Sequence, residues 1–298
     1  MTSRLMLGLP APAKLNLFLR VIGRRPDGYH ELQTAFVAIG LADTLDFELL
    51  DGARIERRGD LAGPPEQDLA VRAARLLQQQ SRCGQGVRID LRKRIPAGGG
   101  LGGGSSDAAT TLLALNRLWR LHWQRERLAE LALQLGADVP FFLQPGPALG
   151  EGIGERLRPL ALAPCWYALI HPQVAVSTSE IFRSSELTAH LEAFKIKSFP
   201  EEGSSPGGLS AGGADRDGCV WRARGNDLEP IVRRRVPEVD AALRYLSQSG
   251  DARMTGSGAC VYAAFDTEAQ ARHALDATPA RWSAWAVPGL VEHPLAPW

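Results

Sequence analysis

The stretch Pro96-Ala97-Gly98-Gly99-Gly100-Leu101-Gly102-Gly103-Gly104-Ser105-Ser106 determines how the rest of the sequence is interpreted. It follows residues 87–91, whose alternating apolar and polar side chains predict a β-strand, and it leads into apolar residues at helical spacing. Several unobstructed backbone N–H groups should meet at the positive end of a helix dipole, where glycines let a triphosphate approach closely. The stretch therefore predicts a phosphate-binding loop, in preference to a flexible glycine linker.

Three well-known glycine-rich or serine motifs do not match this run. A Walker loop ends in GK[ST], and no lysine follows these glycines. A Rossmann loop follows a continuously apolar strand and has an acidic residue about 20 positions on, whereas the strand here alternates and residues 119–124 hold no carboxylate. The GxSxG turn of serine hydrolases is not completed either. Dinucleotide binding and serine hydrolysis are therefore not expected.

The serines that end the run are candidates for contacts to a ligand. The hydroxyls of Ser105 and Ser106 can donate to phosphate oxygens or help to hold a magnesium ion. Together with Asp107 they are also favourable residues for starting a helix. We expect that helix to continue through Leu112 and Leu115, which lie on one of its faces.

Outward from the glycine run, the chain alternates between predicted strands and predicted helices. Besides 87–91, the predicted strands are residues 13–21, 32–39, 44–50, 166–170, 259–265 and 282–287. The other predicted helices are residues 69–79, 125–135, 231–249 and 268–275. Because the pattern changes near residue 160, we expect an α+β protein with two domains, 1–160 and 161–298. Residues 198–217 are rich in Gly, Ser, Pro and charge, and they predict a loop that packs against nothing.

Composition and charge restrict the classes of function. The 298 residues are 45% hydrophobic and 22% charged with a net charge of +1, which is typical of a soluble globular enzyme. This balance predicts neither nucleic acid nor a membrane as partner, and the basic runs 92–94 and 233–235 are interpreted as solvated faces. The four cysteines are scattered and the six histidines form no metal-binding motif, so disulfides and a zinc site are not expected. Without a long apolar segment, a cytoplasmic location is expected.

Five segments together resemble one enzyme family. The glycine run is similar to the second motif of the GHMP kinases, in the longer form of the diphosphocytidyl-methylerythritol kinases. Residues 12–17 (PAKLNL) are similar to the first motif and residues 255–260 (TGSGAC) to the third. Residues 27–32 (DGYHEL) and 135–142 (LGADVPFF) are hallmarks of the same family. The resemblance therefore covers most of the chain.

The resemblance implies a fold, an activity and small-molecule partners. The fold is the two-domain GHMP kinase fold, with an N-terminal domain like ribosomal protein S5, a ferredoxin-like C-terminal domain and the active site between them. The activity is ATP-dependent phosphorylation of the 2-hydroxyl of 4-diphosphocytidyl-2-C-methyl-D-erythritol, in the non-mevalonate route to isoprenoid precursors. Mg²⁺ is implied by the triphosphate chemistry, although the sequence identifies neither its protein ligands nor an oligomeric state. A GHMP kinase with another alcohol substrate and a regulatory nucleotide-binding protein of this fold remain alternatives.

The resemblance implies two catalytic residues, Lys14 and Asp138. A carboxylate would take the proton from the attacking hydroxyl, and a nearby ammonium would stabilise both it and the incoming phosphoryl group. From the residues alone, Asp138 could instead cap a helix that starts at Val139, and Lys14 could be solvated on the polar face of its strand. A pure binding protein needs no base, so the presence of both residues favours a catalyst.

The resemblance also implies which residues bind the two substrates. The residues assigned to ATP phosphates are Pro96, Ala97, Gly98, Gly99, Gly100, Leu101, Gly102, Gly103, Gly104, Ser105 and Ser106. The cytosine would lie between aromatic rings and beside a histidine, which implies Tyr29, His30 and Phe182. Asn16 and Thr178 would lie close to the same substrate.

One position departs from the family. Its members commonly carry asparagine before the leucine that opens the helix predicted at 69–79, and that amide helps to read adenine. This chain has Asp68 there, and an ionised carboxylate only accepts hydrogen bonds, whereas an amide also donates. Asp68 is therefore interpreted either as an adenine contact or as a helix N-cap.

Overall fold

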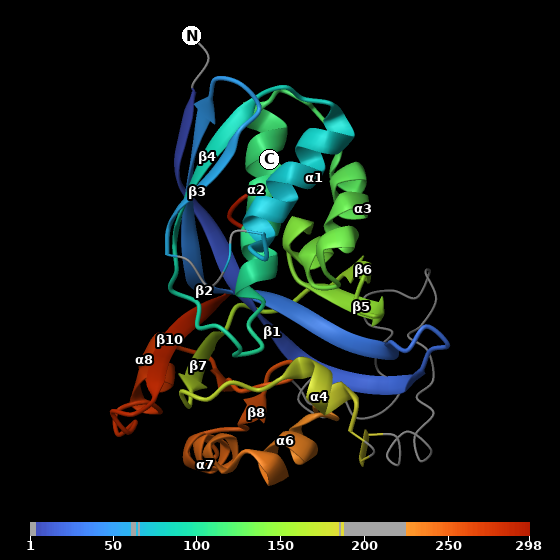
Figure 1. The fold of residues 1–298 in the computed structure, drawn as a ribbon. Coiled ribbons are helices and arrows are strands. Elements are labelled where there is room, and N and C mark those ends of the chain that lie inside the picture. The colour runs from blue at the N-terminus through green and yellow to red at the C-terminus, as the bar shows by residue number, and fades with distance from the viewer. Residues whose placement is uncertain (1–3, 61–63, 65, 185, 188–224) are drawn as a thin grey trace.

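A computed structural model describes residues 4–60, 64, 66–184, 186–187 and 225–298 of the chain (Figure 1). The predicted loop at 198–217 lies outside the described residues. The described part contains one ten-stranded sheet with helices packed against it, which confirms the predicted α+β class. Within that part, no helix is long and apolar enough to cross a membrane.

A long antiparallel hairpin of β1 (Leu5–Arg24) and β2 (His30–Leu50) forms the centre of the sheet. A tight turn closes it: Arg25 donates its N–H to the carbonyl of Tyr29 at 2.7 Å, and Gly28 has a positive φ of 88°. This turn places the side chains of the predicted DGYHEL segment at one end of the hairpin.

The strand boundaries predicted for this hairpin are wrong. Residues 32–39 and 44–50 belong to one continuous strand rather than two. The register shifts between Pro12 and Ala13, where β2 has two extra residues, Gly40 and Leu41. The apparent break in the sequence is therefore a bulge inside one strand, because a bulge interrupts the alternation without ending the ladder.

The sheet joins the two halves of the chain. Its strand order is β3-β4-β2-β10-β7-β9-β8, while β1 and β5 also pair with β2 and β6 pairs with β5. In β10, Gly289 and Leu290 pair with β2, and the preceding residues pair with β7, so β10 connects the two halves. The strands are β3 (Ile55–Gly59), β4 (Gly86–Arg92), β5 (Ala148–Gly152), β6 (Arg156–Pro159), β7 (Trp166–His171), β8 (Arg253–Met254), β9 (Val261–Phe265) and β10 (Ser283–Leu290).

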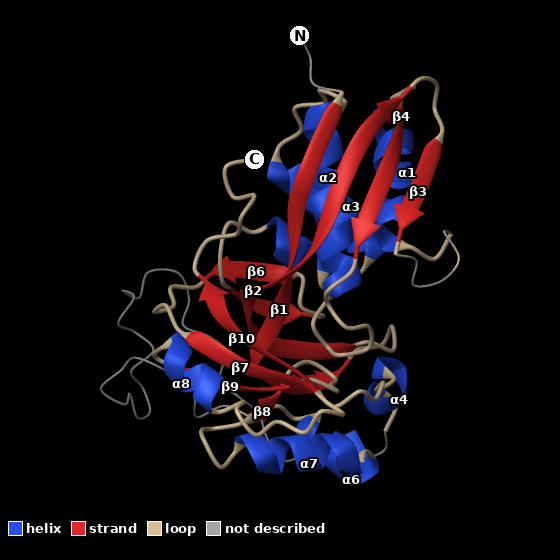
Figure 2. Ribbon diagram, turned by 90° about the vertical axis from the view of Figure 1, so that its left-hand side faces the viewer, coloured by secondary structure: helices blue, strands red, loops and turns tan. Residues whose placement is uncertain are grey.

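Three helices of the first half lie together on one side of the strands β1 to β4 (Figure 2). They are α1 (Leu69–Ser81), α2 (Gly103–Leu118) and α3 (Arg125–Leu135), so the helices predicted at 69–79 and 125–135 are confirmed. Their apolar faces form one core with the sheet, which includes Leu77, Leu112, Leu115, Leu128, Phe47 and Ile89. This core positions α2 behind the glycine run.

The start of α2 differs from the prediction. The helix begins two residues before the serines, at Gly103, and its N-cap is Gly102 in the left-handed conformation. Ser106 and Asp107 are buried within the helix instead of standing before it. Glycine takes the cap position because φ is +71° there, a conformation that side chains disfavour.

The second half carries shorter helices, α4 (Thr178–Phe182), α6 (Glu229–Arg235), α7 (Pro237–Leu246) and α8 (Glu268–His273). The single helix predicted at 231–249 is wrong, because the chain breaks at Val236, which has a φ of −130°. Pro237 has no N–H to continue the preceding helix, but it suits the first turn of the next one.

The last residues return to the first half of the molecule. Arg125 of α3 donates to the carbonyl oxygens of Leu295, Ala296 and Trp298 at 2.6 to 3.1 Å. The guanidinium of Arg117 lies 4.5 Å from the centre of the Trp298 ring. A domain boundary at residue 160 therefore remains a prediction, and the final segment packs on the N-terminal side of it.

Candidate active site

The glycine loop between β4 and α2 is held by hydrogen bonds from two sides. On one side, the N–H of Lys14 in β1 donates to the carbonyl of Leu101 at 2.9 Å. On the other, Ala259 and Cys260 donate to the carbonyls of Gly98 and Gly99 at 3.3 and 3.1 Å. Both flanking segments belong to the predicted first and third motifs, so the three motifs meet at this loop.

Close packing explains why this loop is rich in glycine. A Cβ at Gly100 would lie 2.5 Å from the carbonyl oxygen of Thr255, and one at Gly99 would lie 2.8 Å from the sulfur of Cys260. A Cβ at Gly102 would meet Phe142 at 3.0 Å and Lys14 at 3.1 Å. These glycines are therefore needed for contact between segments as well as for the approach of a ligand.

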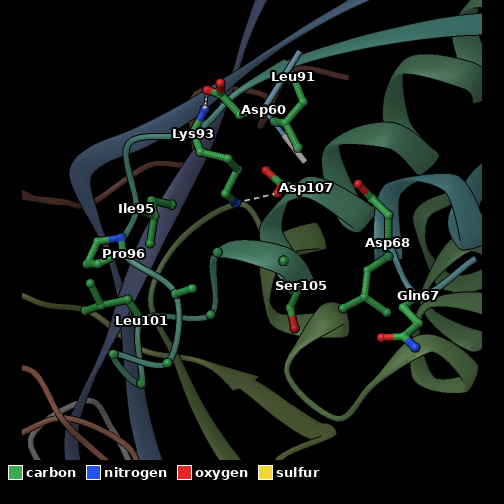
Figure 3. Close-up of a pocket in the computed structure, with 18 of the residues that line it drawn as sticks. Asp60, Gln67, Asp68, Leu91, Lys93, Ile95, Pro96, Leu101, Ser105 and Asp107 are labelled. Carbon is green, nitrogen blue, oxygen red and sulfur yellow. Dashed lines mark hydrogen bonds and ion pairs between the residues drawn. The ribbon is translucent and has the colours of Figure 1, made fainter. Parts of the chain in front are cut away.

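A first pocket of about 390 Å³ lies along the outer face of the loop (Figure 3). It is lined by every residue from Pro96 to Ser105, whereas Ser106 is buried behind them. Asp68 and Gln67 lie across the pocket from Leu101 in Figure 3. The pocket thus brings the predicted phosphate-binding residues, apart from Ser106, together with Asp68.

Asp68 is the N-cap of α1. Its Oδ1 accepts the N–H groups of Ala70 and Val71 at 2.8 and 3.4 Å, which confirms the capping interpretation. Its Oδ2 accepts from Nε of Arg57 at 2.9 Å, and the Arg57 side chain is almost fully buried. Both carboxylate oxygens are therefore engaged inside the protein, and an adenine contact stays a prediction.

A buried charge cluster at the rim of this pocket was missed by the sequence interpretation. The Lys93 ammonium contacts a carboxylate oxygen of Asp107 at 2.7 Å (Figure 3). It also contacts a carboxylate oxygen of Asp43. Asp43 also accepts the N–H groups of Arg94 and Ile95, at 2.5 and 2.8 Å, just before the glycine loop begins. The basic run 92–94 is therefore not simply a solvated face, and Asp43 fixes the entry to the loop.

Asp107 gives this cluster a predicted pH dependence. Burial raises its pKa to about 7; the charge of Lys93 opposes this rise, and that of Asp43 adds to it. Because the folded-state pKa lies above the unfolded value, this group favours folding most at low pH, and that contribution is lost as pH rises from about 4 to 7. We expect Asp107→Asn to flatten this slope, measured as melting temperature at pH 5 and pH 8. Parallel decreases in wild type and variant would contradict the prediction.

A second pocket of about 970 Å³ lies on the other side of the glycine loop. Gly100, Gly102 and Ser105 line both pockets, so the two cavities meet at the loop. The second pocket collects all the predicted catalytic and substrate-binding residues, which are Lys14, Asn16, Tyr29, His30, Asp138, Thr178 and Phe182.

Lys14 and Asp138 form an ion pair, with Nζ and Oδ2 separated by 3.4 Å. The Lys14 side chain is only 4% exposed, so the solvated interpretation is wrong, whereas Asp138 is 36% exposed to the pocket. Asp138 precedes the 3₁₀ helix η1 (Val139–Leu143), but its side chain makes no capping hydrogen bond within the described residues. The Asp138 carboxylate is therefore accessible to a ligand and lies beside the buried Lys14 ammonium.

The Lys14 ammonium is enclosed by groups that stabilise a positive charge. Oδ1 of Asn16 accepts from Nζ at 2.5 Å, and the centre of the Phe36 ring lies 5.5 Å from Nζ. Phe36 in turn stacks on Phe141, with ring centroids 4.9 Å apart. Phe36 was missed from the sequence, because an apolar residue on a predicted strand gives no sign that it faces a site.

The aromatic end of the second pocket is formed by the hairpin turn and α4. The rings of His30 and Phe182 lie 5.3 Å apart, tilted by 37°, and Tyr29 is 61% exposed beside them. Burial, together with the charge of Arg24, lowers the pKa of His30, which favours the neutral imidazole. Thr178 of α4 shares a 2.7 Å hydrogen bond with Ser257 of the third motif. A flat heteroaromatic ring fits this end of the pocket.

The donor groups at the glycine loop fit a magnesium ion that accompanies a triphosphate. Such an ion takes most of its oxygens from phosphate and water and few from protein. Within the described residues, no cluster of three or more His, Cys, Asp or Glu side chains could hold a metal alone. Ser105 lines both pockets, and the buried Oγ of Ser106 has no hydrogen-bond partner in the described part of the chain. These two hydroxyls fit as the few oxygen ligands that the protein would add to the ion.

Family models and curated relatives both match the GHMP kinases. The model of the GHMP kinases N terminal domain matches residues 68–146, and that of GHMP kinases C terminal matches residues 219–284. The chain is 53% identical to the 4-diphosphocytidyl-2-C-methyl-D-erythritol kinase of Thiobacillus denitrificans, over 96% of both chains. It is 49% identical to the enzyme of the same name from Aromatoleum aromaticum, over 97% of this chain and 95% of the other.

Solved structures agree with this similarity. A crystal structure of 4-(cytidine 5'-diphospho)-2C-methyl-D-erythritol kinase matches with a TM-score of 0.74 and 36% identity, covering 96% of this chain and 98% of that one. A homoserine kinase from Cytophaga hutchinsonii matches with a TM-score of 0.70 and 18% identity, covering 98% and 96%. The second likeness concerns the fold alone.

Proposed function

The chain belongs to the 4-diphosphocytidyl-2-C-methyl-D-erythritol kinases of the GHMP kinase family, and from this premise we propose how its site works. It transfers the terminal phosphate of ATP to the 2-hydroxyl of 4-diphosphocytidyl-2-C-methyl-D-erythritol, in the non-mevalonate route to isoprenoid precursors. The observation that carries the proposal is the ion pair of Lys14 and Asp138 beside Gly102, which lines both pockets. ATP occupies the first pocket and the alcohol the second, so the reacting groups meet at the glycine loop.

Asp138 acts as the general base. Its carboxylate accepts the proton of the 2-hydroxyl while that oxygen forms a bond to the γ-phosphorus, and the bond from this phosphorus to the bridging oxygen breaks to release ADP. The Lys14 ammonium, 3.4 Å from Oδ2 of Asp138, holds the carboxylate in place and stabilises the negative charge on the transferred group. Its burial strengthens both effects, because water screens the charge less there.

The glycine loop and the aromatic end of the second pocket orient the two substrates. Backbone N–H groups of the loop and the N-terminus of α2 bind the phosphates of ATP. The hydroxyls of Ser105, which lines both pockets, and of Ser106, which is buried without a partner among the described residues, would help to hold Mg²⁺, and the ion would neutralise charge on the phosphates. His30 and Phe182 hold the cytosine, with Tyr29 and Thr178 beside it. As part of the proposal, the enzyme works in the cytoplasm on these small molecules.

A coupled ADP-release assay tests this function. Purified protein with ATP and Mg²⁺ is expected to release ADP with 4-diphosphocytidyl-2-C-methyl-D-erythritol, and far more slowly with mevalonate, homoserine or galactose. Faster turnover of another alcohol would reassign the substrate. ATP binding without turnover of any of the four would indicate a regulatory protein of the same fold.

A further inference from the structure

A series of buried hydrogen bonds links Lys14 through Asn16 to Thr34, and all three residues border the second pocket. Nζ of Lys14 donates to Oδ1 of Asn16 at 2.5 Å, and Nδ2 of Asn16 donates to Oγ1 of Thr34 at 2.8 Å. The hydroxyl of Thr34 donates to the carbonyl of Phe18 at 2.6 Å. Thr34 is 1% exposed, and its side chain lies on β2 beside the first motif on β1.

The donors and acceptors in this series of hydrogen bonds allow only one orientation of the Asn16 amide. An ammonium has only donors, so the amide must turn its oxygen toward Lys14. The Thr34 proton is used at the Phe18 carbonyl, so Oγ1 must accept, and the amide must turn its NH₂ group toward Thr34. The two requirements agree, and each end of the amide is fixed by its neighbour.

The backbone of Asn16 is fixed as well. Its N–H donates to Oγ1 of Thr255 at 2.8 Å, and its carbonyl accepts from the hydroxyl of Tyr262 at 3.1 Å. Both partners are buried residues of the second half of the chain. The backbone of Asn16 is therefore fixed in place. A substitution at Thr34 should change mainly the orientation of the Asn16 side-chain amide.

We propose that Thr34 is a positioning residue, which through Asn16 holds the Lys14 ammonium between Asp138 and the glycine loop. The proposal rests on the function proposed above, since it assigns Thr34 a role in the same reaction. Asn16, which the sequence placed near the substrate, then acts first on Lys14. Thr34 borders the second pocket but is only 1% exposed, and its hydroxyl proton is donated to the Phe18 carbonyl, so Thr34 supports the lysine rather than binding the substrate.

Kinetics of three variants test the proposal. Thr34→Val keeps the shape but removes the hydroxyl, and we expect kcat to fall about tenfold with both KM values within about twofold, since a buried network loses one partner. Thr34→Ser should restore most of kcat, because it restores the hydroxyl. In a Lys14→Met background, Thr34→Val should cause no further loss, because its effect passes through Lys14.

Thr111→Val is the matched control. It removes another fully buried hydroxyl, which bonds the carbonyl of Asp107 within α2, and it should cost stability without lowering kcat. Three outcomes would each overturn the proposal. They are a normal kcat in Thr34→Val, an effect of Thr34→Val on KM alone, and a fall in kcat of about tenfold when Thr34→Val is added to Lys14→Met.

Crystal structures of the Thr34 variants separate this proposal from the assigned reaction. In Thr34→Val we expect the Lys14–Asp138 contact, 3.4 Å in the native chain, to lengthen beyond about 4 Å, the limit of an ion pair, while Thr34→Ser retains it. An unchanged contact in Thr34→Val would refute the positioning role whatever alcohol the enzyme uses. A failed substrate assay with a displaced lysine would refute only the assigned substrate.

Discussion

Replacing Asp138 with asparagine is expected to lower kcat roughly 10²- to 10⁴-fold, about 3 to 5 kcal/mol of barrier, with little change in ATP affinity. Asparagine has nearly the same size but cannot accept the proton of the hydroxyl. The native carboxylate makes no capping bond among the described residues, so the substitution should leave η1 intact. Steady-state kinetics and a direct binding measurement for ATP separate the two effects.

The partner substitution shows whether the pair acts as a unit. Lys14→Met keeps much of the apolar stem in its buried site but removes the charge 3.4 Å from Asp138, so its loss should also fall mainly on kcat. If the base needs the ammonium, the double variant will be little slower than the slower single variant. Additive losses would show independent roles. Near-normal turnover of a folded Asp138→Asn protein would remove Asp138 as the base.

Replacing Gly102 with valine is expected to weaken ATP binding by roughly 100-fold, about 3 kcal/mol, and substrate binding far less. Gly102 has a φ of +71°, which costs a side-chain-bearing residue about 1 to 2 kcal/mol, and its Cβ would lie 3.0 Å from Phe142. The loop must shift to relieve this strain, and its N–H groups then leave the phosphate positions. Because the new side chain also meets Lys14, affinity must be measured by calorimetry rather than inferred from turnover.

Gly52→Val is the matched control for backbone strain. Gly52 has a φ of +78°, but a Cβ there would meet nothing within 4 Å, and the residue lies between β2 and β3 outside both pockets. We expect it to lower the melting temperature and leave ATP affinity unchanged. If Gly102→Val instead abolished binding of the alcohol and spared ATP, the nucleotide would belong in the second pocket.

Local motifs in the sequence were sufficient to predict much of this site. The glycine run, Lys14 and Asp138 each lie in a short segment with a recognisable pattern, and the structure brings these segments together. The predicted α+β class and GHMP kinase family are confirmed. The assignment of roles to individual residues remains a set of predictions that the variants above address.

Features that depend on distant segments could not be predicted in this way. Lys93 meets Asp43 and Asp107 only because three segments converge at the first pocket, and a basic run alone gives no sign of that. Thr34 likewise lies beside Asn16 only through pairing of β1 with β2. The break at Pro237 is different, because a proline inside a helical pattern is a signal present in the sequence itself.

The bonds that hold the glycine loop from both sides have a consequence for ATP affinity. Glycine-rich segments lose more conformational entropy on ordering than other segments. Here Lys14, Ala259 and Cys260 order the loop as the protein folds, so little of the free energy of ATP binding is lost to immobilising it. Substitutions that loosen residues 255–260 should therefore weaken ATP binding without contacting the nucleotide, because they return the loop to a disordered ensemble.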